Sequence, residues 1–517
     1  MGQSSQGRSG RRGAPLKVLE DRTPLNGDRV DIATRVAWLL RTARLSAPAT
    51  RGLPQYAMVE RLRETGLAVS RNWVHRLEAG DLRSGLGAEG YEKVLGLAPG
   101  RLRATIDLVC RSGPVSPPDS DPGALLDDVV AISAATDAVL VDRPTGWQWF
   151  TWARQFSRPE VRGLRVQVAR ALIERLCSEL CRSVDAAYDS RYEALAAIRS
   201  GPYGDLVVEA ARAEIADPHV QSVIDLISAV AEVVDDAARE FCTELVGDAR
   251  AHVALAGAHG VENLLAATGA GGPEWARLGA AVAAAFDRAE PDSDLAAGLA
   301  HALRLLAARR VPLPTVSRPL PPTVEADVPA RGATAEQWSR CQRLAADIGA
   351  GLGLGPDPML ARLLFDLLVG RSGNSAFASS RLLSALPFAP QVVAHVLAFA
   401  EAETEPALRR RMVQRIASVA GAQAPEGVGH WLEDADLRPA ALVLLAHGGV
   451  QPDGALLRSL LAVPDAWSRA LYAAGMTGHP LLTEAAATGQ PAHVAGAARW
   501  WLRHGTRVVD PVPAPPD

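Results

Sequence analysis

Residues 53–80 read LPQYAMVERLRETGLAVSRNWVHRLEAG. In the first half of this stretch the apolar residues are three or four positions apart, the spacing of one face of a helix. This spacing predicts a helix from Gln55 to about Glu64 or Thr65, followed by a turn at Gly66. The second half repeats the pattern, so the stretch predicts two consecutive helices joined by a turn.

The second of these helices has signals at both ends. Ser70 can cap it, because a serine hydroxyl accepts a hydrogen bond from an otherwise unpaired backbone N–H. Gly80 suits the left-handed conformation in which many helices end. At 100° per residue, the apolar side chains share one side and the polar side chains share an arc of about 140° on the other. The apolar set is Trp73, Val74 and Leu77, and the polar set is Arg71, Asn72, His75 and Arg76.

The motif over residues 69–80, VSRNWVHRLEAG, resembles the recognition helix of the Xre/Cro-type helix-turn-helix regulators, whose pattern is VSxxxISRxExG. LPQYAMVERL is similar to the LSQxxLAxxL helix that precedes it in that family. RVAWLLRTAR (35–44) resembles the family's first helix, and GYEKVLGLAPGRLRATIDLV (90–109) resembles its last two. The resemblance implies a five-helix, DNA-binding domain over 31–111.

Two departures from the family spacing affect the turns of this domain. About five residues are added between Leu62 and Val69, and about four between Arg44 and Gly52. The additions imply a longer second helix and a looser first turn. A set of long actinobacterial regulators resembles this chain in these insertions, and the Arg- and Ala-rich composition fits a genome of high GC content.

Carried over by position, the resemblance implies a role for each polar residue of the motif. Arg and Asn suit guanine and adenine edges respectively, so Arg71, Asn72 and Arg76 would reach bases, unless they only keep the helix soluble. Ser70 would cap the helix or touch the DNA backbone. For His75 two roles are equally expected, a phosphate contact or a solvated surface position. The expected DNA-binding residues are Gln55, Ser70, Arg71, Asn72, His75 and Arg76.

The remaining family positions concern phosphate and structure. Gln55, at the start of its helix, would bond a phosphate. Family members pair the glutamate at the position of Glu78 with an arginine of the first helix, here Arg44, so Glu78 is expected to be structural. A flexible arm with Arg8, Arg11 and Arg12 would enter a minor groove if it binds DNA at all, because such tails are more often only disordered.

Composition supports a helical protein. The 517 residues are 48% hydrophobic and 22% charged, which excludes a largely disordered chain. Aromatic residues are only 5%, and abundant Ala, Leu, Arg and Glu favour helices over strands. Residues 1–111 contain 19 Lys and Arg against 11 Asp and Glu, while the remainder has a net charge of −12. Only the first fifth is therefore suited to a polyanion.

Proline-rich stretches divide the remaining chain, since such segments cannot sustain a helix. After the second stretch the predicted helices are short, which is typical of a HEAT-like repeat, although no fixed period is evident. The fold expected is all-α, with a helical bundle and a helical-repeat region after the helix-turn-helix domain. The expected divisions are a flexible basic arm (1–30), the DNA-binding domain (31–111), a linker (112–123), a helical domain (124–310), a second linker (311–333), a repeat domain (334–506) and a tail (507–517).

Signals of catalysis or of metal binding are weak. The sequence has no GxxxxGK[ST], GxSxG or HExxH motif, and its five cysteines include no CxxC pair. Cys177 and Cys181 are four residues apart, and we interpret them as buried rather than metal-binding. The aromatic stretch 146–156 is a core element or the lining of a ligand pocket, and Trp500 and Trp501 indicate docking of the last helix or an oligomer contact. No enzyme activity, cofactor or metal is expected.

The function expected is that of a cytoplasmic, nucleoid-associated transcription regulator that reads double-stranded DNA with residues 70–78. One small domain rarely gives enough specificity, so a homodimer is expected, with the helical region mediating dimerisation and binding a protein partner or an effector. No membrane contact is expected, since no apolar run approaches a spanning length. The alternatives are a helical-repeat scaffold that binds proteins, or a peptide or small-molecule receptor, each with an accessory helix-turn-helix module.

Overall fold

The computed structural model of the chain describes residues 18–27, 29–113, 115–118, 129–158, 164–267, 272–321, 331–370, 372–464 and 466–511. Within these ranges the regular elements are helices, accompanied by one isolated parallel bridge between Ser183 and Val508. The prediction of an all-α fold is confirmed. It follows from a composition rich in strong helix formers and poor in aromatic residues.

The N-terminal part contains five α-helices that begin within the expected span 31–111, and the last of them ends one residue beyond it, at Ser112. The short 3-10 helix η1 (Pro48–Thr50) occupies the added residues after the first of them. The predicted helix that starts at Gln55 ends at Glu64, as expected. These helices are α1 (Ile32–Ser46), α2 (Gln55–Glu64), α3 (Arg71–Ala79), α4 (Gly85–Leu95) and α5 (Arg103–Ser112).

Ten helices form the middle of the described chain, and neighbours in sequence pack on one another, as α12 does on α13 and α14 on α15. They are α6 (Val129–Leu140), α7 (Gly146–Phe156), α8 (Val166–Leu180), α9 (Ala186–Arg199), α10 (Gly204–Ala216), α11 (Ile224–Ala231), α12 (Asp236–Val246), α13 (Ala251–Ala267), α14 (Pro273–Arg288) and α15 (Asp294–Ala308).

The C-terminal helices continue this packing, with α16 on α17, α17 on α18 and α22 on α23. They are α16 (Arg331–Leu352), α17 (Pro358–Leu368), α18 (Gly373–Ser384), α19 (Ala389–Glu401), α20 (Pro406–Ile416), the 3-10 helix η4 (Val428–Leu432), α21 (Arg438–Gly448), α22 (Gly454–Leu461), α23 (Trp467–Thr477), α24 (Leu481–Ala485) and α25 (Ala492–His504).

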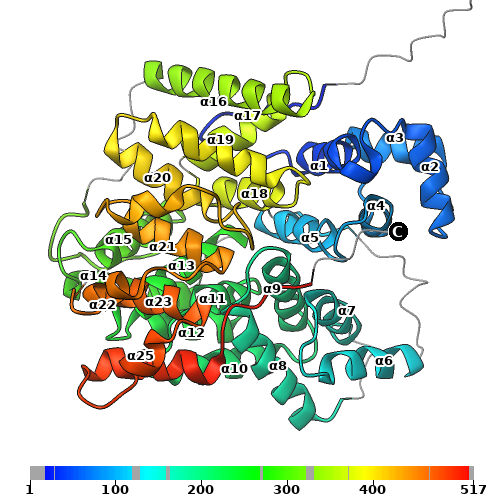
Figure 1. Cartoon of the computed structure of the whole chain (residues 1–517). Coiled ribbons are helices and arrows are strands. Elements are labelled where there is room, and N and C mark those ends of the chain that lie inside the picture. Colours follow the sequence, from blue (N-terminus) through cyan, green and yellow to red (C-terminus); the bar gives the residue numbers. More distant parts are fainter. Residues whose placement is uncertain are drawn as a thin grey trace, which may run out of the picture.

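The hydrophobic cores do not follow the proline-rich divisions. One core joins α1–α5 to α16–α21, and the other joins α6–α15 to α21–α25. Helix α21 contributes to both, with Leu444 in the first core and Leu442 in the second. In Figure 1 the C-terminal helices accordingly extend from the top of the molecule to its lower left, while α2 and α3 lie at its right edge.

Parts of the segments expected to be flexible pack on helices instead. Leu19 and Asp21 of the expected arm are buried, and Asp21 pairs with Arg35 of α1. In the expected tail, Val508 pairs with the backbone beside α8, and Asp510 forms an ion pair with Arg191 at 3.0 Å. In both segments a carboxylate compensates a buried guanidinium, and this fixes the chain locally.

The expected linkers also differ in extent from the structure. Helix α16 begins at Arg331, before the expected start of the third region at 334, because no proline follows Pro329 in this part of the chain. At the first linker, the carbonyl of Pro118 accepts a hydrogen bond from Arg103 at 2.9 Å, so the start of this linker is attached to α5. Residues 1–17, 119–128, 322–330 and 512–517 lie outside the described residues, and with them Arg8, Arg11 and Arg12.

Candidate nucleic-acid interface

Helix α3 begins and ends as its sequence predicts. Ser70 has extended backbone angles, and its Oγ accepts a hydrogen bond from the backbone N–H of Trp73 at 3.2 Å. Gly80 has φ of +85°, a left-handed conformation that favours glycine, and its N–H bonds back to the carbonyl of Arg76. These local hydrogen bonds define a helix of nine residues.

One side of α3 is packed closely against the other N-terminal helices. Val74 and Leu77 are buried, and the Trp73 ring lies over α4. A β-carbon placed at Gly87 of α4 would come within 2.7 Å of that ring, so the absence of a side chain there allows α4 to approach α3. The prediction that Trp73, Val74 and Leu77 share an inward face is confirmed.

A buried carboxylate connects α3 to three neighbouring elements. Glu78 is fully buried and accepts two hydrogen bonds from Arg44 of α1, at 2.5 Å from Nε and 2.7 Å from Nη2. Its other donors are the amide of Gln55, at 2.8 Å, and the hydroxyl of Tyr91, at 2.7 Å. The expected pairing of Glu78 with Arg44 is confirmed, and sequence reasoning did not find the contribution of Tyr91.

The network also sets the charge state of Glu78. Burial by itself raises the pKa of this carboxyl, but the hydrogen bonds and positive charge of Arg44, with the hydrogen bonds of Gln55 and Tyr91, bring it below its ordinary value of 4.5. Glu78 is therefore an ionised structural residue. Gln55, which was expected to contact a phosphate, donates one of its amide hydrogens to Glu78. It is half-buried at the start of α2.

The opposite side of α3 is exposed. Arg71, Asn72, His75 and Arg76 all face solvent. Within the described parts of the chain, no hydrogen bond or ion pair engages the side chains of Arg71, Asn72 or His75, and Arg76 reaches only the carbonyl of Asp81, at 3.4 Å. The structure thus brings together the donors predicted on α3, with Ser70 exposed beside them and Gln55 on the neighbouring helix.

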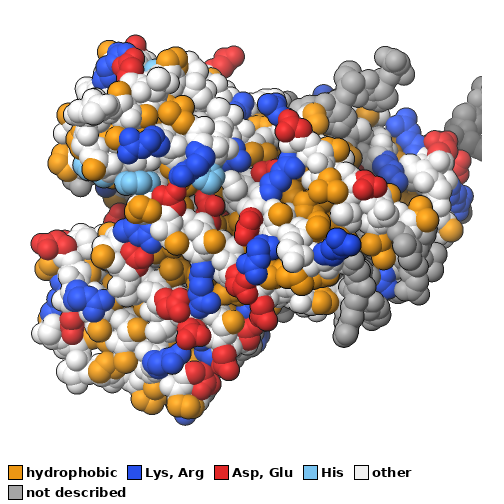
Figure 2. Space-filling model, turned by 90° about the horizontal axis from the view of Figure 1, so that it is seen from below, with side chains coloured by type: hydrophobic (Ala, Val, Ile, Leu, Met, Phe, Trp, Pro, Cys, Tyr) orange, Lys and Arg blue, Asp and Glu red, His pale blue; other side chains and the backbone are white. Residues whose placement is uncertain are grey.

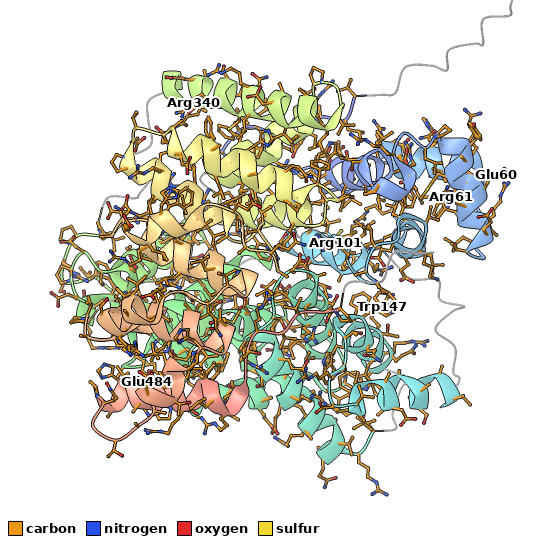
Figure 3. All side chains as sticks on the ribbon, viewed as in Figure 1. Glu60, Arg61, Arg101, Trp147, Arg340 and Glu484 are labelled. Atoms are coloured by element: carbon orange, nitrogen blue, oxygen red, sulfur yellow. The ribbon has the colours of Figure 1, made fainter. Side chains whose placement is uncertain are left out.

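The surface around α3 carries charges of both signs. Arg61 and Arg63 of α2 are exposed, and so are Glu60 and Glu64 on the same helix. Figure 3 shows Glu60 and Arg61 at the outer edge of the molecule. Over the face seen in Figure 2, basic and acidic side chains are interspersed. Any preference of α3 for a polyanion therefore rests on its own arginines more than on a broad positive field.

The orientation of α3 is set by buried ion pairs on the far side of the N-terminal helices. Arg35 of α1 is fully buried, and its three guanidinium nitrogens each donate a hydrogen bond. The acceptors are Asp21 at 2.7 Å, Asp366 of α17 at 2.5 Å and Ser379 of α18 at 3.1 Å. These bonds hold α1 against the C-terminal helices and leave α2 and α3 on the outside (Figure 1).

Helix α5 is attached in a similar way to α9. Three acids spaced four residues apart along α9 and its N-terminal cap face three donors on and just before α5. Figure 3 places Arg101 between α5 and the helices below it. The pairs are Arg101 with Asp185 at 3.1 Å, Thr105 with Asp189 at 2.6 Å and Arg111 with Glu193 at 3.1 Å.

Other features singled out in the sequence are structural. Trp149 and Trp152 are buried in the core with α8 and α9. Trp500 and Trp501, which belong to α25, are buried in the same core. Burial raises the pKa of both the Cys177 and Cys181 thiols, which keeps them protonated. Among the described residues, no group of His, Cys, Asp and Glu side chains is arranged to hold a metal ion.

Comparison of the sequence with protein-family models found no match, and comparison with curated proteins found none either. In the part of the chain that the structure describes, no helix combines the length and apolarity needed to cross a membrane.

Proposed function

We propose that the chain is a sequence-specific, DNA-binding transcription regulator in which α1–α5 form an Xre/Cro-like helix-turn-helix domain. One observation carries the proposal: α3 buries its apolar side in the N-terminal core while Arg71, Asn72, His75 and Arg76 face outward from the edge of the molecule. A short helix that projects arginine and asparagine side chains has the donors that read guanine and adenine in the major groove.

The residues of the site divide between bases and phosphates. Arg71, Asn72 and Arg76 contact base edges, and Ser70 and His75 contact the DNA backbone. Gln55 donates its remaining amide hydrogen to a phosphate, with its orientation held by the bond to Glu78. Buried ion pairs attach α1–α5 to the remaining helices, α6–α25, which we call the helical body. Because of this attachment, the helical body fixes the angle at which α3 meets DNA.

The helical body would increase specificity for DNA by joining two copies of the chain. We propose that α16–α25 form a HEAT-like helical repeat, and that the body mediates homodimerisation and binds a protein partner or an effector. A dimer would place two copies of α3 on half-sites roughly one helical turn apart.

The proposal is tested by selecting binding sequences from a randomised pool of double-stranded DNA and measuring affinity for the enriched sequence by fluorescence anisotropy. Arg71→Ala should lose about 1–3 kcal/mol of binding free energy and relax the preference at one base pair. Affinity for the wild type should fall steeply with salt, because bound counterions are released from the phosphates.

The control is Arg143→Ala, which removes one positive charge from a side chain 94% exposed outside the N-terminal helices. It should leave affinity and sequence preference unchanged. If the wild type enriches no sequence, or if Arg143→Ala weakens binding as much as Arg71→Ala does, sequence reading by α3 is wrong.

A further inference from the structure

A cavity of about 520 Å³ lies where the N-terminal helices meet the helical body. Its walls come from α5, from the extended residues 116–118, from α7 with the two residues after it, and from α9. The volume is within the range of sites for small molecules. The wall combines charged side chains with the apolar surfaces of Phe150, Pro117 and Ala197.

Two of the guanidinium groups in the cavity wall already donate hydrogen bonds to carboxyl groups. Arg111 binds both carboxylate oxygens of Glu193, at 3.1 and 3.2 Å. Arg103 donates through Nε to Asp107 at 2.9 Å. The carboxylates of the wall are thereby both committed to arginines of α5.

Arg154 of α7 has no equivalent partner. Its nearest carboxylate is Glu89, at 3.8 Å, and its guanidinium lies 5.3 Å from the centre of the Phe150 ring. No hydrogen bond to its guanidinium is found within the described residues. Burial and the positive charge of Arg103 both lower the pKa of Arg154, so an anion beside it would relieve an unfavourable environment.

Two buried polar atoms of the cavity wall, Oδ1 of Asp107 and Nη1 of Arg103, have no hydrogen-bond partner among the described residues. Asp107 is buried, and its Oδ1 has no hydrogen-bond partner within the described residues although Oδ2 accepts from Arg103. Buried polar atoms without partners are rare in proteins and are often completed by a bound molecule. Asp107 and Arg154 face the same cavity from different helices, α5 and α7.

We propose that this cavity binds a small organic anion, with its acidic group on Arg154 and its ring or hydrocarbon body against Phe150 and Pro117. A donor on the ligand would satisfy Oδ1 of Asp107. The ligand would be held jointly by α5 of the N-terminal helices and by α7 of the body. Any effect of the ligand on DNA affinity rests on the proposed function, whereas its binding does not.

The test is isothermal titration calorimetry of the full-length protein, without DNA, using benzoate, phenyl phosphate and the neutral analogue methyl benzoate, which has no hydrogen-bond donor, as probes. At least one anion should bind at one site per chain at millimolar concentration or below, and methyl benzoate should not. Preference between benzoate and phenyl phosphate then distinguishes a carboxylate from a phosphate ligand. Absence of binding by both anions overturns the proposal, and so does equal binding of methyl benzoate.

Two variants locate the site. Arg154→Gln should weaken anion binding about tenfold or more, because a charge-assisted hydrogen bond is lost. Ala197→Leu fills part of the cavity without removing a charge and should also weaken binding, so a result remains even if one variant fails to fold. Arg143→Gln should bind as the wild type does. Unchanged binding in either folded cavity variant overturns the assignment.

Discussion

Glu78 shows how one residue can organise the N-terminal helices without being part of their exposed surface. Its two carboxylate oxygens receive donors from α1, α2 and α4. A buried ion pair of this kind adds modest net stability, but removing one member leaves the other charge buried and uncompensated. The contribution of Glu78 to the stability of the fold is therefore best measured with a variant that lacks its negative charge.

Glu78→Gln should destabilise the folded protein by about 3–5 kcal/mol, because Arg44 stays buried without its counter-charge. Urea denaturation followed by circular dichroism measures the change. The matched control is Glu60→Gln, which changes an exposed carboxylate on α2 and should leave the midpoint almost unmoved. Equal midpoints for the two variants would show that the buried network is not needed for stability.

The stability contributed by Glu78 should depend on pH. Its pKa in the folded protein is below the ordinary value of 4.5, so the unfolded chain takes up the proton first as the pH falls. The contribution is complete above pH 4.5 and is lost as the pH falls through the folded-state pKa. The difference in Tm between wild type and Glu78→Gln should shrink over that acidic range, and a constant difference would contradict an ionised Glu78.

At the scale of the element, α3 is defined mostly by its own residues. Ser70 closes its first turn and Gly80 its last, and neither contact needs a distant part of the chain. Helix α5 is different, because its position depends on acids of α9 that lie about eighty residues away in sequence.

Ser70→Ala should cost about 1 kcal/mol of stability, because the N–H of Trp73 loses its acceptor at the start of the helix. Hydrogen exchange should increase first in α3. Ser70→Asn keeps a capping oxygen and should restore most of the loss. If the asparagine and alanine variants are equally destabilised, the hydroxyl of Ser70 does not act as a cap.

Across the molecule, the N-terminal helices share one hydrophobic core with the C-terminal helices. Their core is completed by α16–α21, and Arg35 finds two of its three acceptors on α17 and α18. A chain that ends at residue 118 would expose this apolar surface and leave Arg35 with Asp21 alone.

The fragment 1–118 should therefore lack a cooperative thermal transition, as followed by near-ultraviolet circular dichroism. The control is the full chain cleaved once at a protease site introduced between residues 118 and 129. Its two pieces should stay together on gel filtration, because the shared core and the α5–α9 pairs hold them. A fragment that melts at the same temperature as the cleaved complex would contradict the shared core.

The helical class, the limits of α2 and α3, the cap at Ser70 and the division of α3 into an apolar and a polar side could all be predicted from the amino-acid sequence. These features depend on hydrogen bonds and periodicity within a few residues, so they can be read from neighbouring positions. The Arg44–Glu78 pair was accessible only through the family resemblance, since nothing local links two residues on different helices.

Which charges are buried together depends on how the helices pack and could not be predicted from the sequence. Arg35 and Asp366 are 331 positions apart, and Arg154 meets the cavity wall of α5 because α7 and α9 pack there. In a chain with many arginines, each guanidinium has many possible carboxylate partners, and helix packing selects among them by distance and desolvation. For the same reason the proline-rich segments marked breaks in the helices but not the limits of the two cores.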